Sequence, residues 1–256
     1  SKEVANEVET AVSEIEAEEV YEEEKKTRHN IRALVNCIQK RVSEEAKPYV
    51  HFTTTSFDIV DTANVLRLKE ATNELILPTL KSLEKKLIEI AQREKETVQI
   101  GRTHGQAAVP ITFGFTIAEY VSRLGERIEA IANSATKLKG KISGAVGAYN
   151  ASSLFFDDPE DFEKQVLSHL GLKAGEYSTQ IVMPEGVTDY VHNLISTFGV
   201  LANFSDDMRH LQRSEIGEVG EHFSKDQVGS STMPHKRNPI NYENVKSMWK
   251  KFMPQM

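Results

Sequence analysis

Residues 80–90 read Leu-Lys-Ser-Leu-Glu-Lys-Lys-Leu-Ile-Glu-Ile, and the spacing of their apolar side chains decides the class of fold. Apolar residues three or four positions apart share one face of an α-helix, and charged residues occupy the other positions. The pattern predicts an amphipathic helix over residues 61–98, which Pro78 should kink or divide because proline removes a backbone donor. The buried face of this helix would carry Leu80, Leu83, Leu87 and Ile90.

Later segments repeat this pattern. Residues 112–139 predict a second long helix and residues 187–212 a third, while shorter helical patterns lie over residues 4–25 and after Asp158-Pro159. Strand-like alternation is nearly absent. Long helices with apolar stripes need partners, so the predicted fold is all-α, a bundle of long helices. The two later stripes consist of Ile117, Val121, Leu124, Ile128 and Ile131, and of Val187, Val191, Leu194, Phe198 and Leu201.

The composition limits the class of protein. The chain has 256 residues and a formal net charge of -7, so it can form a sizeable core, and its acidity disfavours general nucleic-acid binding. No apolar run approaches the ~20 residues of a membrane span, so we expect no membrane contact. Cys37 is the single cysteine, which excludes an internal disulfide. Its apolar helical surroundings predict a buried thiol, and this cysteine usage fits a protein of the reducing cytoplasm.

Residues 229–239 read Gly-Ser-Ser-Thr-Met-Pro-His-Lys-Arg-Asn-Pro. The prolines at 234 and 239 exclude a regular helix or strand. A bare Gly-Ser-Ser is more often a flexible surface turn. Here Lys236 and Arg237 follow closely, so the segment concentrates hydroxyls, backbone N–H groups and positive charge, which together can hold an oxyanion.

A second polar segment, Gly101-Arg-Thr-His-Gly-Gln106, is predicted to form a loop between two of the long helices. An isolated histidine in such a place is more often a surface side chain of a helix-capping turn. His104 differs because Arg102, Thr103 and Gln106 can orient it and contact an anion. A histidine with a pKa near neutrality can donate a proton to a leaving nitrogen.

A third segment runs from His51 to Asp61 and places a cluster of threonine and serine before the first long helix. Ser56 and Asp58 are candidates for capping that helix. The free N–H groups of the helix N-terminus could instead bind a carboxylate or phosphate. The residues alone leave both interpretations open.

These segments resemble motifs of one family. Residues 229–239 resemble the signature loop of the fumarase/aspartase superfamily, and residues 101–106 resemble its second motif as found in the adenylosuccinate lyase family. Gly105 follows the motif histidine where fumarases and argininosuccinate lyases typically carry leucine. The resemblance covers about residues 25–256. It implies a long-helix bundle of the L-aspartase/fumarase type, assembled as a homotetramer whose active sites are shared between subunits.

The resemblance also implies a reaction. We expect a lyase that cleaves a C–N bond of adenylosuccinate, and of the related succinyl-carboxamide imidazole ribotide, by anti β-elimination in purine nucleotide biosynthesis. Fumarate is released, and neither a cofactor nor a metal is required. Ser230 would remove the Cβ proton as an alkoxide, and His104 would protonate the departing nitrogen.

Further positions match substrate-contacting residues of the family. Thr55 and Ser56 match a Thr-Ser pair, and His51 matches a histidine close to the substrate. Thr27-Arg-His-Asn30 matches an Arg-His-Asp segment, with Asn30 in place of the usual acid. The substrate-binding residues that the resemblance implies are therefore Arg28, His29, His51, Thr55, Ser56, Thr103, Gln180, Lys236, Asn238 and Glu243.

The resemblance suggests how the chain is divided. Residues 1–60 would form a partial N-terminal helical domain, and residues 61–256 a central helical-bundle domain that ends just after the signature loop. The family's C-terminal domain would be absent, so we expect a fragment. Alternatives are another lyase of the superfamily, such as an argininosuccinate lyase or a carboxymuconate cycloisomerase-like enzyme, and a non-catalytic helical scaffold derived from such a lyase.

Overall fold

The computed structural model describes residues 1–255, and most of these residues are helical. The predicted all-α fold with long helices is confirmed. The one sheet within the described residues is an antiparallel hairpin of β1 (Val98–Thr103) and β2 (Gln106–Thr112). The α-helices are α1 (Lys2–Ser13), α2 (Ala17–Thr27), α3 (Asn30–Gln39), α4 (Ser56–Ala71), α5 (Leu77–Arg93), α6 (Phe113–Thr136), α7 (Pro159–His169), α8 (Glu185–Leu211) and α9 (Ile240–Phe252).

The chain folds as two compact units, each built from two separate stretches of sequence. Unit 1 contains Ser1–Leu68 and Leu138–Pro184, and unit 2 contains Lys69–Lys137 and the chain from Glu185 onward. Each unit has its own hydrophobic core. The predicted domain boundary at residue 60 stays a prediction. The two compact units are defined by contacts within a single chain, and such contacts do not test that boundary.

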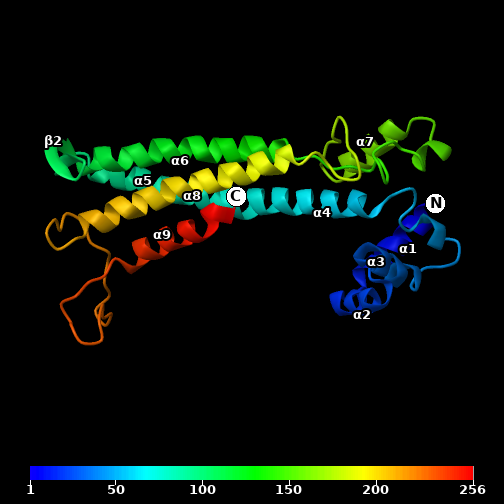
Figure 1. Cartoon of the computed structure of the whole chain (residues 1–256), viewed down its shortest axis with the longest axis horizontal. Helices are drawn as coiled ribbons and strands as arrows, with labels where there is room; N and C mark the ends of the chain where they lie inside the picture. Colours follow the sequence, from blue (N-terminus) through cyan, green and yellow to red (C-terminus); the bar gives the residue numbers. More distant parts are fainter. Residues whose placement is uncertain (256) are drawn as a thin grey trace. The chain divides into compact units, whose positions relative to one another are not determined.

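In unit 2, helices α5, α6, α8 and α9 pack side by side (Figure 1). The predicted stripe of the first long helix, from Leu80 to Ile90, belongs to the core between them. Burial of each leucine or isoleucine side chain contributes about 1.5–3 kcal/mol, so the stripes hold the bundle together. The buried members of this core are Leu87, Ile117, Tyr120, Leu124, Ile128 and Met208.

The predicted interruption at Pro78 is present. The α-helical pattern of α4 gives way to a π-helical turn at Thr72–Ile76, in which the Leu77 amide bonds to the Thr72 carbonyl, and α5 begins at Leu77. Pro78 has no N–H to donate to the carbonyl four residues earlier. The wider π turn absorbs this missing hydrogen bond.

The segment predicted as a loop at residues 101–106 is instead part of the β1–β2 hairpin, so this prediction was wrong. The hairpin lies between the two long helices, because α5 ends at Arg93 and α6 begins at Phe113. Thr103 pairs with Gln106, and the two residues between them, His104 and Gly105, have φ of 54° and 75°. Two consecutive positive φ angles are the signature of the tight type I′ turn, which matches the twist of a hairpin.

In unit 1, helices α1 and α3 pack around a core that includes Val4, Val35 and Val42. The pattern predicted over residues 4–25 is divided, because Ile15 lies between α1 and α2 and packs against this core. Cys37 is buried, as predicted.

Residues 16–24 are rich in glutamate, and this acidic run is not exposed to solvent at every position. Glu19 pairs with Arg41 at 2.6 Å and Glu23 with Lys40 at 2.8 Å. Both ion pairs join α2 to the two residues that directly follow α3. The acidic run therefore serves partly to attach one helix to its neighbour.

Candidate active site

The candidate residues fall into two groups, one in each compact unit. Each group is described by itself below. Unit 1 contains Arg28, His29, His51, Thr55, Ser56 and Gln180, and unit 2 contains Thr103, His104, Ser230, Lys236, Asn238 and Glu243.

His104 occupies the tip of the β1–β2 hairpin. Its φ of 54° lies in the left-handed region, which a non-glycine residue adopts at an energetic cost. Thr103 and His104 are both exposed, and the His104 ring makes no hydrogen bond to any residue between 1 and 255. The hairpin thus presents a free imidazole on a rigid, strained turn, as a proton donor for an external molecule requires.

The hairpin is attached to the segment that follows α8. Arg102 donates from Nη2 to Glu218 Oε1 at 2.5 Å, and Gln99 donates from Nε2 to Glu218 Oε2 at 2.9 Å. The hydrogen bond from Arg102 is the largest cause of a lowered pKa at Glu218, so this carboxylate is ionised at neutral pH. Both carboxylate oxygens are therefore used to fix the strand that leads to His104.

Ser230 lies in the loop before α9, and its hydroxyl oxygen receives two backbone donors. The amides of Thr232 and Met233 lie 3.4 and 3.2 Å from Ser230 Oγ. Donors aimed at an oxygen stabilise negative charge on it. This arrangement supports the alkoxide that the sequence interpretation requires, because an alkoxide forms only where its charge is compensated.

The loop folds back on itself around Gly229. A Cβ atom at this position would lie 2.0 Å from the Lys236 carbonyl oxygen, so a side chain cannot fit. Asn238 donates from Nδ2 to the Gly229 carbonyl at 3.1 Å. Asn238 thereby shapes the loop around Ser230, while the Lys236 side chain is exposed.

Two residues that the sequence interpretation missed fix the base of this loop. Gln212 donates to the Arg237 carbonyl at 3.2 Å and accepts from the Glu221 amide at 2.9 Å. Glu221 accepts from the Tyr242 amide at 3.0 Å and so caps α9, whose own N-cap residue is a proline. Glu243, in the first turn of α9, is exposed.

In unit 1, His29 and Ser56 meet although 27 residues separate them. His29 Nε2 lies 3.2 Å from Ser56 Oγ. The other ring nitrogen, Nδ1, accepts from the Arg32 amide at 3.3 Å and caps α3. A neutral ring that accepts at Nδ1 carries its proton on Nε2, so His29 donates to Ser56 and leaves the serine hydroxyl free to donate onward.

Backbone strain is concentrated near the candidate residues of unit 1. Arg28, His51 and Thr53 have φ of 54°, 65° and 59°. The His51 ring lies 2.7 Å from the Thr54 hydroxyl, and burial lowers its pKa below the ordinary value, so the ring is neutral at physiological pH. Such strain persists only where the surrounding structure enforces it, and it gathers at functional sites.

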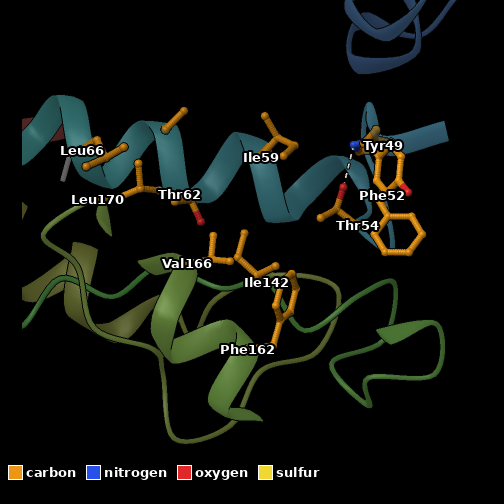
Figure 2. Close-up of a pocket in the computed structure, with 12 residues that line it drawn as sticks. Tyr49, Phe52, Thr54, Ile59, Thr62, Leu66, Ile142, Phe162, Val166 and Leu170 are labelled. Atoms are coloured by element: carbon orange, nitrogen blue, oxygen red, sulfur yellow. Dashed lines mark hydrogen bonds between the residues drawn. The ribbon is translucent and has the colours of Figure 1, made fainter. Parts of the chain in front are cut away.

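A cavity of about 530 Å³ opens beside this strained segment, between the first half of α4 and α7 (Figure 2). Its volume is in the range of small-molecule sites. His51 and Thr54 supply polar groups, whereas most of the wall is apolar. The apolar lining consists mainly of Phe52, Ile59, Leu66, Ile142, Phe162, Val166 and Leu170.

Gln180 is exposed and lies in a short segment that two anchors hold. Ser178 Oγ lies 2.6 Å from Ser143 Oγ, and the Val182 amide donates to Asp61 Oδ2 at 2.8 Å. Asp61 belongs to α4, the helix that begins at Ser56. The segment that carries Gln180 is therefore tied to the helix that carries Ser56.

Known proteins resemble this chain over most of its length. The chain is 40% identical to adenylosuccinate lyase of Pyrococcus abyssi over 90% of this chain and 50% of the relative. It is 40% identical to adenylosuccinate lyase of Bacillus subtilis over 90% of this chain and 52% of the relative. The chain thus spans about half the length of the curated relatives it matches.

The fold has also been seen before. A crystal structure of 3-carboxy-cis,cis-muconate lactonizing enzyme from Pseudomonas putida superposes with a TM-score of 0.87 at 25% identity, over 99% of this chain and 57% of that one. A protein-family model described as "Lyase" matches residues 2–253. Because that match covers nearly the whole chain, the protein belongs to the lyase family, within the fumarase/aspartase superfamily.

Proposed function

We propose that the full-length protein is an adenylosuccinate lyase. The observation that carries the reaction type is the Ser230 hydroxyl, which receives two backbone N–H groups in a loop that glycine and asparagine hold closed. The substrate class follows from the relatives, which are named adenylosuccinate lyase and match about 90% of this chain. Gly105 after the motif histidine favours the same assignment over argininosuccinate lyase.

In this proposal Ser230 begins the elimination. Its alkoxide takes the Cβ proton of the succinyl group, and the electrons of the C–H bond move onto the adjacent carboxylate to give an aci-carboxylate intermediate. The Thr232 and Met233 amides compensate the charge on Oγ before this transfer. Lys236 and Asn238 are the proposed partners of the intermediate's extra negative charge.

His104 completes the reaction. The electrons return to form the Cα–Cβ double bond of fumarate, and the C–N bond breaks with its pair going to nitrogen. The imidazolium of His104 gives that nitrogen its proton, and the products are fumarate and AMP. We further propose that acid and base reach one site from different subunits of a homotetramer, on opposite faces of the scissile bond.

The unit 1 residues would bind the substrate. The first turn of α4 offers backbone N–H groups and the Ser56 hydroxyl, both of which suit a carboxylate or phosphate. Arg28 would add positive charge, and the neutral rings of His29 and His51 would add hydrogen-bonding groups. No cofactor enters this proposal, and the cytoplasm, where purine nucleotides are made, is its proposed location. Within residues 1–255 no helix is long and apolar enough to cross a membrane.

The proposal can be tested by giving the full-length protein adenylosuccinate, the succinyl-carboxamide imidazole ribotide and argininosuccinate in separate reactions. Ultraviolet absorbance follows the loss of the first two, and a coupled assay follows fumarate from all three. We expect turnover of the first two substrates only. Turnover of argininosuccinate alone would assign another lyase activity, and a stable oligomer that turns over none of them would identify a scaffold.

A further inference from the structure

Unit 1 buries an ion pair that takes no part in the proposed chemistry. The side chains of Asp58 and Lys141 are 0% and 1% exposed, and Lys141 Nζ donates to Asp58 Oδ1. Removing two charges from water costs several kcal/mol per ion, and their attraction repays that cost only when the geometry is good and further hydrogen bonds form. A buried pair of this kind is therefore more readily explained by the segments that it holds in place than by its contribution to stability.

Asp58 gathers backbone donors from two separate segments. Its Oδ2 accepts from the Thr55 amide at 2.8 Å, and Gly144 N lies 3.3 and 3.2 Å from its two oxygens. The contact with Thr55 is the reach-back half of a helix capping box. Capping by Asp58 was predicted as one of two interpretations, whereas the partner Lys141 was not foreseen. Through these bonds Asp58 fixes the turn that presents Thr55 and Ser56.

Lys141 holds the opposite segment in place. Its ammonium also donates to the Gly144 carbonyl at 3.0 Å, so the short loop 141–144 is closed around the pair. The Lys141 backbone donates to Thr62 Oγ1 at 3.1 Å, and the same hydroxyl donates to the Lys141 carbonyl at 3.0 Å. The loop is thus attached to α4 at two successive turns.

This loop in turn supports the segment that carries Gln180. Ser143 Oγ bonds to Ser178 Oγ at 2.6 Å. Gly147, with φ of 75°, packs so closely that a Cβ atom would lie 2.1 Å from the Ser178 carbonyl oxygen. A continuous path of contacts therefore runs from Thr55 through Asp58 and the loop to the segment of Gln180.

We propose that the Asp58–Lys141 pair is the positioning centre of the substrate-binding residues in unit 1. It holds Thr55, Ser56 and Gln180 in one fixed geometry, although neither member of the pair touches the substrate. The inference rests on the proposed function, because it assigns the held residues to substrate binding. Apolar side chains of similar volume would stabilise a core equally well, but they could not collect N–H donors from both segments.

The test compares three variants of the full-length protein, Asp58→Asn, Lys141→Met and the double variant. Lys141→Met alone leaves a buried carboxylate without its cation, so we expect a strong fall in Tm. The double variant removes both charges at nearly constant volume, so its Tm should return close to that of the wild type. The loop keeps the backbone bonds of residue 141 to Thr62 but loses the ammonium that closes it around Asp58 and the Gly144 carbonyl. We therefore expect KM for adenylosuccinate to stay about 10- to 100-fold raised while kcat changes little.

Hydrogen exchange provides a readout that does not depend on activity. Residues 52–60 and 176–182 should exchange faster in the double variant than in the wild type. Val42→Ala is the matched control, because Val42 is buried in the unit 1 core but takes no part in the hydrogen bonds of the pair. It should lower Tm and leave both KM and the exchange of these two segments unchanged.

Two outcomes would overturn the inference. One is a double variant whose KM and exchange return to wild-type values together with its Tm. The other is a Val42→Ala variant that raises KM as much as the double variant does. If the wild-type protein does not turn over adenylosuccinate, the proposed function fails, and faster exchange in both segments still decides whether the pair positions them.

Discussion

Glu218 forms an ion pair with Arg102 across 116 residues of sequence, at 2.5 Å. Arg102 lies in β1, close to the hairpin tip that presents His104. Glu218 lies in the segment that leads from α8 to the Ser230 loop. One carboxylate thus anchors the strand of the proposed acid to the segment of the proposed base, within unit 2.

We predict that Glu218→Gln lowers kcat/KM about tenfold, because a small displacement of a catalytic group strongly reduces the rate. Partly exposed ion pairs contribute only about 0.2–1 kcal/mol, so Tm should change little. Steady-state kinetics and calorimetry on the full-length protein measure both effects. Glu215→Gln is the control, since Glu215 forms an exposed pair with Arg213 nearby and should have no effect on either quantity. Equal kinetics for the two variants would show that the anchor has no role in catalysis.

The Ser230 loop should depend on glycine at position 229. Gly229→Ala places a methyl group against the Lys236 carbonyl, so the backbone must move and the amide donors must leave Ser230 Oγ. We expect kcat to fall at least about 100-fold, the effect of removing one preorganised donor in other enzymes, with little change in Tm. Gly220→Ala is the control, because a Cβ atom there meets nothing within 4 Å. Normal turnover by Gly229→Ala would mean that the loop geometry is not the catalytic one.

The helices were predictable from sequence because their signal is local. The stripe from Leu80 to Ile90 repeats every helical turn, and it lies in the core of unit 2 as expected. The hairpin was missed because its turn uses His104-Gly105. The common residues of this turn are Asn-Gly and Asp-Gly, and a histidine in the left-handed region is not an evident signal.

The residues of the candidate site could be found by their motifs, but their supports could not. Asp58 and Lys141 are 83 residues apart, and no spacing rule in a single sequence pairs them. The same holds for Arg102 and Glu218. Long-range polar pairs of this kind depend on the packing of whole elements, so they appear only in the folded structure.

Lowering the pH should weaken the contact between α2 and α3, because Glu23 of α2 becomes protonated and loses its ion pair with Lys40. Its hydrogen bond with Lys40 is the largest cause that lowers the pKa of Glu23 to about 2. A carboxyl whose pKa is depressed on folding stabilises the fold above its unfolded pKa, near 4.5, and loses this contribution as pH falls toward 2. In the Glu23→Gln variant, Tm should therefore fall less between pH 4.5 and pH 2 than it does in the wild type. At still lower pH, the Tm values of the two proteins should differ less than they do at neutral pH. Glu22→Gln, on the exposed face of α2, is the control and should leave the pH profile unchanged.

Variants inactivated at Ser230 and at His104 should complement each other when their subunits are mixed. In the full-length protein, Ser230→Ala and His104→Ala should each remove most of kcat and change KM little, because both residues act chiefly in the transition state. If acid and base reach one site from different subunits, hybrids of the two inactive variants contain some sites with both residues intact. Mixing them under conditions that exchange subunits, verified by native mass spectrometry, should then restore part of the activity.

Exchange without recovery would place both residues of a site on one chain. A Ser230→Ala variant with near-normal turnover would move the proton abstraction to another group, and Ser231 is the next residue to replace.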